Sequence, residues 1–527
     1  MDTPRPSPRT NRTRRVPHPV LIGHAATRLT SIQVVVVARE VCWSVRTYAH
    51  LVVVMGSEFY DGREHRYLNY PVTDVLQMLG RAGRPGTDAV GKAVILCHTP
   101  KKEFFKKFLH EPVPVESHLD HYLHDHISAE VVTKVIENKQ EAVDYLTWTF
   151  YYRRLTLNPN YYNMTGTTHR HISDHLSELI ENVINDLEES KCLAVEEDGN
   201  DVSALNLGMI ASYYYIRYTT IELFNSSLNE KTKIKGVLEI LTSASEFDSI
   251  PIRHGEEKAL RQLASHVPLS NDSMKYSDPH TKAFLLIQAH LSRIPLAGDL
   301  AMDQRAVLND AMRLIQAMVD VMSSSGWLKP ALAAMEVSQM VVQALWDSSP
   351  NLLQLPNVTP ELAKECTEAG IETVFDLMDM EDEDRVKLLK MSEAKLGQVA
   401  AVCNRYPNVT LEYEVADADS VAAGESVVLN VKLERDNDGA AENVHAPYYP
   451  KEKEEGWWLL VGDPKANTLL AIKRVKLKSK AGVKLELTAP ETAGKHDLTL
   501  FFMCDGYAGC DQEYEFSLDV GEAMDED

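Results

Sequence analysis

The spacing of apolar residues changes near Tyr406, and this change constrains the fold more than any other feature of the sequence. Over residues 206–350, apolar residues recur at steps of three and four, as in packed amphipathic helices. After Tyr406 they alternate with polar residues, as in half-buried β-strands. The two patterns need different layers around different cores, so the chain is predicted to be a multidomain α+β protein.

Seven short strands are predicted after Tyr406, with the sequences VTLEYEV, SVVLNVKLER, WWLLVGD, LLAIKRVKL, GVKLELTAP, HDLTLFFMCD and EYEFSLDV. Turn residues separate most of them. This number and spacing favour an immunoglobulin-like β-sandwich at residues 406–520, followed by an acidic tail at 521–527. Trp457 and Trp458 open one strand. We expect one of them to pack in the core and the other to be exposed as an anchor for a partner.

The region at residues 31–111 has the pattern of a partial α/β domain. Ile32–Ala38 and Leu51–Met55 are continuous β-branched runs, a helix capped by Asp74 follows, and Ala93–Cys97 is a further buried strand. Strand, helix and strand at this spacing form a βαβ unit. A sheet this small leaves faces uncovered, so only part of such a domain is predicted.

Most of the remaining chain is predicted to be helical. The sequence predicts a disordered basic arm at residues 1–30, a winged helix at 112–205, an all-α helical bundle at 206–350 and a helix–loop–helix unit at 351–405. Glu381–Asp384 is predicted to be a loop of four acidic residues in the last unit. Because four carboxylates repel phosphate, this unit is expected to face protein and not nucleic acid.

The formal net charge of −23 argues against a chain whose main task is to grip a phosphate backbone, since Lys and Arg make most such contacts. Any contact with nucleic acid is expected to be local, and an acidic surface of mixed charge fits a protein that docks other proteins. Seven scattered cysteines favour a reducing compartment. No apolar run approaches the ~20 residues of a membrane span, so we expect no membrane contact.

The segment QMLGRAGR holds the candidate nucleotide-binding residues Gln77, Gly80, Arg81 and Arg84. On the first turns of a predicted helix, the two arginines lie one turn apart and Gln77 one turn earlier, so their side chains would face one anion. Phosphoryl transfer needs such positive charge at the γ-phosphate. The alternative is that the arginines pair with surface acids. The sequence has no G-x-x-x-x-G-K-[ST] loop, so we expect half of a nucleotide site and no catalytic residue in this chain alone.

QMLGRAGRP after VVVVAREVCWSV resembles motifs VI and V of the large DExH-box helicases. From about Ser31 to near its end, the chain is similar to the spliceosomal U5 snRNP family of these RNA helicases, as in HLDHYLHDHISAE, QAHLSR, SSSGWLKPALAAMEV and GCDQEYEFSLDV. The matching part is the C-terminal part of the second of two helicase cassettes. The resemblance implies a partial second RecA-like domain, a winged helix, a helical bundle of the Brl type, a helix–loop–helix and an immunoglobulin-like domain.

The resemblance also implies a function. The family unwinds RNA in pre-mRNA splicing, in the nucleus and among spliceosomal proteins, and its second cassette acts as a docking and regulatory module. ATP with Mg is expected only in a complete parent enzyme, because the phosphate-binding loop and the DExH box are missing here. In the motif V stretch, Ser44, Arg46 and Tyr48 replace the Gly, Asn and Pro of active members, which implies a weak or inactive nucleotide site.

The helix predicted at Gln304–Ser325 resembles the family's ratchet helix, which touches the tracking RNA strand. Arg313 matches its RNA-contacting arginine, and Asp310, one turn earlier, would repel the same phosphates. We therefore expect at most a weak RNA contact. The alternative for Arg313 is a surface salt bridge with its neighbours.

Histidines cluster in two places, at His118, His121, His124 and His126 and again at His169, His171 and His175. No Cys joins them and no general base has zincin spacing, so we expect polar helix residues and no metal.

Other functions stay open at this point. The two-cassette helicase of the activating signal cointegrator complex belongs to the same superfamily. An ER protein-translocation adaptor shares the Brl module. A third alternative is an ATP-driven helicase half that a separately encoded partner completes.

Overall fold

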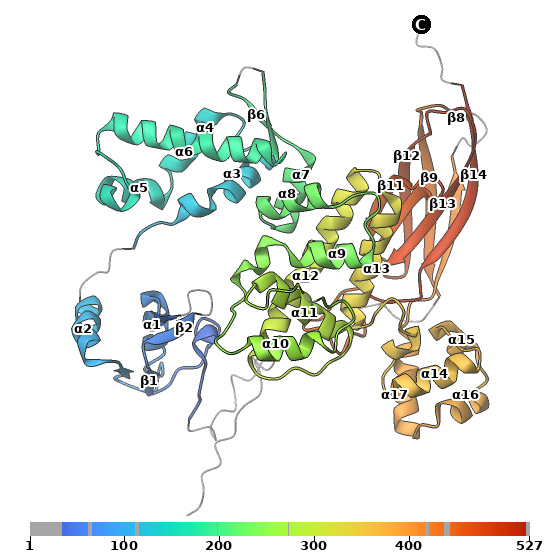
Figure 1. Cartoon of the computed structure of the whole chain (residues 1–527), viewed down its shortest axis with the longest axis horizontal. Coiled ribbons are helices and arrows are strands. Elements are labelled where there is room, and N and C mark those ends of the chain that lie inside the picture. Colours follow the sequence, from blue (N-terminus) through green and yellow to red (C-terminus); the bar gives the residue numbers. More distant parts are fainter. Residues whose placement is uncertain are drawn as a thin grey trace, which may run out of the picture. The chain divides into compact units, whose positions relative to one another are not determined.

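The computed structural model describes residues 34–61, 66–110, 115–197, 199–271, 273–416, 421–436 and 443–522. The predicted basic arm at 1–30 lies outside these ranges, as does the acidic tail beyond Glu522. The chain divides into two compact units, the first reaching Val113 and the second running from Pro114. Figure 1 labels their α-helices and many of their strands.

The first unit contains a parallel and an antiparallel strand pair. Its elements are a 3₁₀ helix (Arg39–Val41), β1 (Leu51–Met55), β2 (Glu58–Asp61), β3 (Arg66–Asn69), α1 (Val72–Leu79), β4 (Lys92–Leu96), a 3₁₀ helix (Thr99–Lys101) and α2 (Lys102–His110). β1 pairs in parallel with β4, and β2 pairs antiparallel with β3. Because α1 lies between β1 and β4 in the chain, the predicted strand–helix–strand order is present for these elements.

Little of this unit is buried. Its core consists of Val75 of α1 with Phe105 and Phe108 of α2. The predicted strand Ile32–Ala38 is wrong in its described part, because residues 34–38 pair with no described strand and the valines among them are 43–89% exposed. Five apolar side chains of β1 and β4 are also 42–79% exposed, namely Leu51, Val53, Met55, Val94 and Leu96.

The second unit begins with four α-helices and a strand pair. They are α3 (Leu123–Val132), α4 (Lys139–Thr147), α5 (Phe150–Leu157), α6 (His169–Glu189), β5 (Leu193–Val195) and β6 (Val202–Ala204), with 3₁₀ turns at Leu119–Tyr122 and Pro159–Tyr162. β5 and β6 pair antiparallel. A long helix running into a short strand pair agrees with the pattern expected from the sequence.

Seven helices follow and share one apolar core. They are α7 (Asn206–Tyr214), α8 (Tyr218–Ser227), α9 (Ile234–Thr242), α10 (Glu257–Ala264), α11 (Pro279–Leu291), α12 (Asp299–Ser324) and α13 (Leu328–Gln343), with a 3₁₀ turn at Ser245–Ser249. Every residue of α11 from Lys282 to Leu291 is buried. The Lys282 ammonium is fully buried and lies 2.7 Å from a Glu256 oxygen and 2.6 Å from an Asp303 oxygen.

Four short helices form the next part of the chain. They are α14 (Pro360–Glu368), α15 (Val374–Asp379), α16 (Asp382–Leu389) and α17 (Glu393–Cys403), after a 3₁₀ turn at Asn351–Gln354. The predicted acidic loop at Glu381–Asp384 is wrong, because Glu381 is the N-cap of α16 and the next three acids occupy its first turn. Carboxylates are favourable there, since they face the positive end of the helix dipole.

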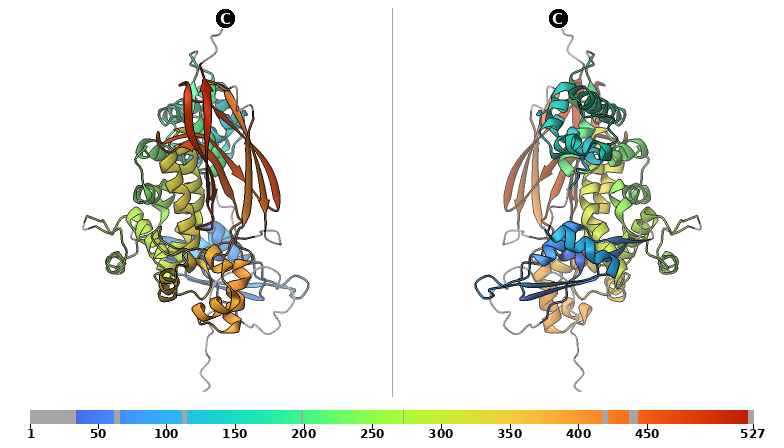
Figure 2. Two further views of the ribbon diagram at one scale, coloured as in Figure 1. Left: turned by 90° about the vertical axis from the view of Figure 1, so that its right-hand side faces the viewer. Right: turned by 90° about the vertical axis from the view of Figure 1, so that its left-hand side faces the viewer.

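The C-terminal part consists of two sheets. Its strands are β7 (Val409–Val415), β8 (Val421–Ala422), β9 (Ser426–Arg435), β10 (Trp457–Asp463), β11 (Thr468–Val475), β12 (Lys480–Thr488), β13 (Gly494–Cys504) and β14 (Gln512–Gly521). One sheet has the order β11-β10-β13-β14-β8 and the other β12-β9-β7. All seven predicted strands are present, and the described residues add the short β8. Figure 2 shows the two sheets with the long helices along one side.

The five-stranded sheet is buried on both faces at β10. Trp457 packs between the sheets, stacked on Phe502 with ring centroids 4.2 Å apart. Trp458 and Leu460 point the other way and join the core of the helices, together with Phe501. The expectation that one tryptophan is exposed is therefore wrong, because each is only 1% exposed.

Candidate functional site

The segment QMLGRAGR crosses the end of α1. The helix stops at Leu79, and Gly80 is its C-cap, with its N–H donating to the carbonyl of Leu76. Gly83 then adopts a φ of 94°, which favours glycine. The prediction that Arg81 and Arg84 lie on the first turns of a helix is wrong, because two glycines within four residues end the helix before them.

The turn after α1 is fixed against the chain just before β1. The N–H of Ala49 donates to the carbonyl of Arg81 at 3.0 Å, and the N–H of Gly83 donates to the carbonyl of Ala49 at 2.8 Å. Gln77 stays behind on the last turn of α1, where it is partly buried. The predicted half-site is thus divided between a helix and a turn.

Arg84 is bound by an acid four residues later. Its Nε and Nη2 donate to the two carboxylate oxygens of Asp88 at 2.8 and 2.7 Å, and its main-chain N–H donates at 3.0 Å. These hydrogen bonds from Arg84 hold the pKa of the Asp88 carboxyl well below its usual range. The alternative in which this arginine pairs with an acid therefore holds for Arg84.

Arg81 has a different environment. Its guanidinium carbon lies 5.4 Å from the centre of the Tyr48 ring, within the range of a cation–π contact. Its Nε is buried and has no hydrogen-bond partner among the described residues. A buried unpaired donor is rare in folded proteins, so Arg81 keeps a donor with which an anion can pair. Of the two arginines, Arg81 is the stronger candidate.

The helix that is predicted to have Asp74 as its N-cap begins about one turn earlier in the structure. The N-cap of α1 is Pro71, and Asp74 lies in the first helical turn. Its carboxylate accepts from Trp43 Nε1 at 2.9 Å and pairs with Arg39 at 3.4 Å. The segment that contains Arg39 and Trp43 is thereby bound to the first turn of α1.

Arg313 lies on α12 and is occupied by contacts within the chain. Its guanidinium pairs with Asp310 at 3.0 Å and donates to the carbonyls of Tyr214, at 3.4 Å, and Tyr215. Tyr215 is the C-cap of α7 and has a left-handed backbone, with φ 54°. Arg313 thus satisfies carbonyls at the end of α7, and the salt-bridge alternative agrees with the structure.

The histidines make separate contacts. His118 stacks on His121 with centroids 6.0 Å apart, His124 pairs with Asp186 at 2.8 Å, and His175 bonds the Tyr151 hydroxyl at 3.1 Å. Among the described residues, no three His, Cys, Asp or Glu side chains gather as a metal site would require.

Sequence reasoning missed a buried polar junction between α13 and the loop from β13 to β14. Side chains of Ser338, Gln339 and Gln343 donate to the consecutive carbonyls of residues 504–506 at 2.6–2.8 Å. The sequence SQMVVQ contained a signal, since it places polar residues within an apolar helix. Their partners, more than 160 residues away, could not be inferred.

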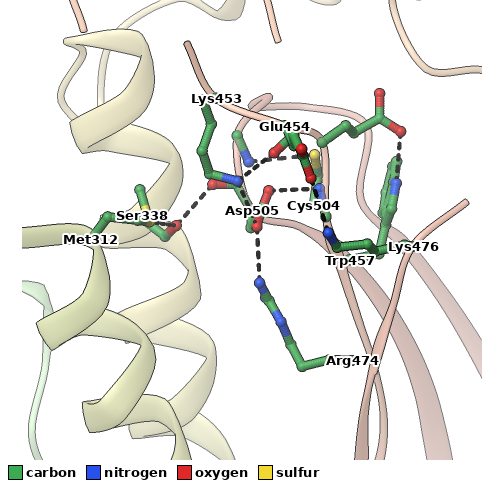
Figure 3. Close-up of polar contacts among 12 residues, drawn as sticks. Met312, Ser338, Lys453, Glu454, Trp457, Arg474, Lys476, Cys504 and Asp505 are labelled. Atoms are coloured by element: carbon green, nitrogen blue, oxygen red, sulfur yellow. Dashed lines mark hydrogen bonds and ion pairs between the residues drawn. The ribbon is translucent and has the colours of Figure 1, made fainter. Parts of the chain in front are cut away.

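The same loop is held from the sheet side by a buried carboxylate. Asp505 is 1% exposed and accepts from Lys453 Nζ at 2.8 Å, Arg474 Nη2 at 3.0 Å and the Gly456 N–H at 2.9 Å (Figure 3). Ser338 of α13 reaches the main chain of the same residue. The loop is therefore fixed to both the helices and the sheet.

Comparison with known proteins assigns two regions to families. The Sec63 Brl domain family matches residues 204–517, and a winged helix-turn-helix domain family matches residues 116–197. Of the helices in the described part of the chain, none has the length and apolar character needed to cross a membrane.

Long relatives match nearly the whole chain. The U5 small nuclear ribonucleoprotein 200 kDa helicase is 56% identical over 501 residues in Drosophila melanogaster and 57% identical over 493 residues in Homo sapiens. The DExH-box ATP-dependent RNA helicase DExH12 of Arabidopsis thaliana is 60% identical over 505 residues. Each alignment covers 94% of this chain and 23% of the relative. These matches confirm the resemblance to the U5 snRNP helicases. Because the Sec63 Brl match spans more than half of the 527 residues, the chain belongs to the Sec63 Brl domain family.

Proposed function

We propose that the chain is the C-terminal part of the second helicase cassette of a spliceosomal RNA helicase and serves as a docking and regulatory module for RNA unwinding in pre-mRNA splicing. The observation that carries this proposal is the identity of 56–60% along 94% of the chain with U5 and DExH12 helicases. The chain spans about a quarter of these relatives. The activity therefore belongs to the proposed parent, which would work in the nucleus among spliceosomal proteins.

The first unit supports an origin in a larger α/β domain. Strands of a parallel sheet are normally covered on both faces, yet the apolar side chains of β1 and β4 are largely exposed. Residues 31–111 are accordingly proposed to be part of a second RecA-like domain whose other strands belong to the parent. Residues 112–205 are proposed as the winged helix, 351–405 as the helix–loop–helix and 406–520 as an immunoglobulin-like domain.

Nucleotide binding is proposed only for the complete parent. Gln77, Gly80, Arg81 and Arg84 would provide one side of the site, with Arg81 as the anion ligand because its Nε is unpaired among the described residues. Arg84 would have to leave Asp88 first. ATP with Mg also needs a phosphate-binding loop, which this sequence does not contain.

An ATPase assay on the purified chain tests the docking role. With saturating ATP, Mg and single-stranded RNA, turnover is expected to equal that of the Arg81→Met variant. RNA-stimulated turnover that this substitution abolishes would overturn the docking-only proposal, because the chain would then complete a site of its own.

Affinity capture from nuclear extract tests the partners. The chain is expected to recover U5 splicing proteins. The activating signal cointegrator 1 complex subunit 3-like protein of Dictyostelium discoideum is 48% identical over 506 residues, which favours a second candidate role in that complex. Recovery of cointegrator subunits or ribosomes without splicing proteins would support this second role, and recovery of translocon subunits would indicate an ER adaptor.

A further inference from the structure

A cleft opens on the second unit where α13 meets the start of α9 and the loop from β13 to β14. Its volume is about 710 Å³, within the range of ligand pockets, which run to roughly 1,000 Å³. The fixed loop described above forms one wall, so this wall is held in place before any ligand arrives. The residues that line the cleft include neither those of the nucleotide half-site nor Arg313.

One wall of the cleft holds a buried acceptor without a donor. Gln343 is 2% exposed, and its Nε2 donates to the carbonyl of Gly506 at 2.6 Å. Its Oε1 is buried and has no hydrogen-bond partner among the described residues. Since this hydrogen bond fixes the amide orientation, the unpaired oxygen is an acceptor available for a ligand that donates.

Two carboxylates in the cleft are not paired with a cation. Asp511 accepts from the Cys504 N–H at 2.7 Å and from Gln339 Nε2 at 2.9 Å, but it forms no ion pair with a described Lys, Arg or His. The side chain of Glu336 on α13 is partly buried and has neither a hydrogen bond nor an ion pair within the described ranges. Burial raises the pKa of both carboxyls, that of Asp511 to about 6. The wall thus presents acceptors that lack positive charge.

The rim of the cleft carries both signs of charge. Lys233, Lys235 and Lys329 line it and are exposed, as are Asp347 and Glu513. None of these lysines lies within ion-pair distance of a described carboxylate of the cleft. Their ammonium groups can stay hydrated at the rim, so they do not neutralise the partly buried acids deeper in the wall.

Apolar side chains complete the cleft and select among cations. Leu332, Met340, Trp346 and Met503 line it and are buried or partly buried. Trp346 is fixed by its own hydrogen bond to Ser292 at 2.9 Å. A guanidinium group is planar, weakly hydrated and able to stack on an aromatic ring while donating several hydrogen bonds, whereas an ammonium group is compact and strongly hydrated.

We propose that this cleft binds an arginine side chain of a protein partner, with Gln343 Oε1, Glu336 and Asp511 accepting from the guanidinium and the apolar wall holding its stem. The occupant is a single arginine side chain of a protein partner, and its charge complements the two carboxylates of the wall, Glu336 and Asp511. The site does not depend on the proposed splicing role, because a synthetic peptide can test it.

The test is a titration of the full chain with the blocked peptide acetyl-Ala-Arg-Ala-amide, in which saturation-transfer NMR measures binding. A peptide with citrulline in place of arginine has the same shape without the charge and is expected to bind at least about tenfold more weakly, as expected for the loss of a charged hydrogen bond. Glu336→Gln and Gln343→Leu are expected to weaken the arginine peptide by about tenfold each. Glu239→Gln, which removes a nearby carboxylate paired with Lys235 at 3.7 Å, is the matched control and is expected to leave binding unchanged.

Equal binding of the arginine and citrulline peptides would overturn the proposal, and so would equal affinity of the control and the two cleft variants. If a lysine peptide binds as tightly as the arginine peptide, the cleft is a general cation site and the arginine assignment is wrong. The Glu336 side chain is partly exposed and forms no hydrogen bond or ion pair within the described ranges, so Glu336→Gln keeps the test decisive even if Gln343→Leu unfolds.

Discussion

Arg313→Met separates a structural role for this arginine from an RNA contact. In the structure, its side chain is 32% exposed, and its guanidinium pairs with Asp310 at 3.0 Å and donates to the carbonyls of Tyr214 and Tyr215 at the end of α7. A hydrogen bond from a charged donor contributes about 1.5–3 kcal/mol, and partial exposure favours the lower part of this range. The ion pair adds about 0.5 kcal/mol. Methionine keeps the apolar stem, so the expected loss in the free energy of unfolding is about 2 kcal/mol.

The assay is urea unfolding of the full chain, monitored by far-UV circular dichroism. Two control variants, both expected to have smaller effects, show how much of the loss comes from the carbonyl contacts. Asp310→Asn removes only the ion pair and is expected to cost less than about 1 kcal/mol. Arg305→Met changes an exposed arginine on the same helix and is expected to stay within about 0.5 kcal/mol of the parent chain.

A contrary outcome is easy to recognise. Arg313→Met could instead leave the stability unchanged and weaken binding to single-stranded RNA. If the slope of the logarithm of the binding constant against the logarithm of the salt concentration also falls in magnitude by about one, Arg313 contacts phosphate. The reasoning from its carbonyl contacts would then be refuted.

Three further changes have defined outcomes. Lys282→Met is expected to lower the free energy of unfolding in urea by about 2 kcal/mol, because the buried Asp303 and Glu256 lose charged hydrogen bonds at 2.6 and 2.7 Å while Arg253 stays paired with Asp303; an unchanged value would contradict this. Trp458→Ala is expected to cost about 3–5 kcal/mol in the same assay, since its side chain joins sheet and helices; a loss below about 1 kcal/mol would contradict that packing. Burial raises the pKa of Asp511 to about 6, so the folded state keeps a proton that the unfolded chain has already lost, and stability falls as pH rises toward and through 6. Asp511→Asn lacks this dependence and is expected to gain about 1 kcal/mol relative to the parent chain between about pH 5 and pH 7.5; a difference that stays constant across this range would show the assignment wrong.

Local periodicity predicted the regular elements well. β7, β9 and β10 coincide with VTLEYEV, SVVLNVKLER and WWLLVGD, because alternating residues and flanking turns determine strands locally. The end of α1 was placed wrongly, although Gly80 and Gly83 are themselves stop signals. Each of these glycines disfavours a helix by about 1 kcal/mol relative to alanine.

The candidate site depended on contacts that periodicity does not encode. Asp88 binds Arg84 from only four residues away, but its position in the sequence does not distinguish it from other surface acids. The carbonyls that hold Arg313 lie 98 and 99 residues away in the chain. The expectation that one of Trp457 and Trp458 is exposed assumes that only one face of the strand is covered, yet the unbroken run WWLLV is typical of a strand covered on both faces.

Because β10 is buried on both faces, the helices and the two sheets cannot be separated without exposing apolar surface. Trp458, Leu460 and Phe501 belong to the core of the helices, and Tyr406, at the change of period, is itself fully buried with its hydroxyl donating to Ala508 at 2.6 Å. If recombination separated the chain at Tyr406, each of the two products would expose one apolar face to water. The Sec63 Brl family match accordingly runs through this position, from residue 204 to residue 517. One family model thus covers both the helices and the two sheets, although their secondary structures differ.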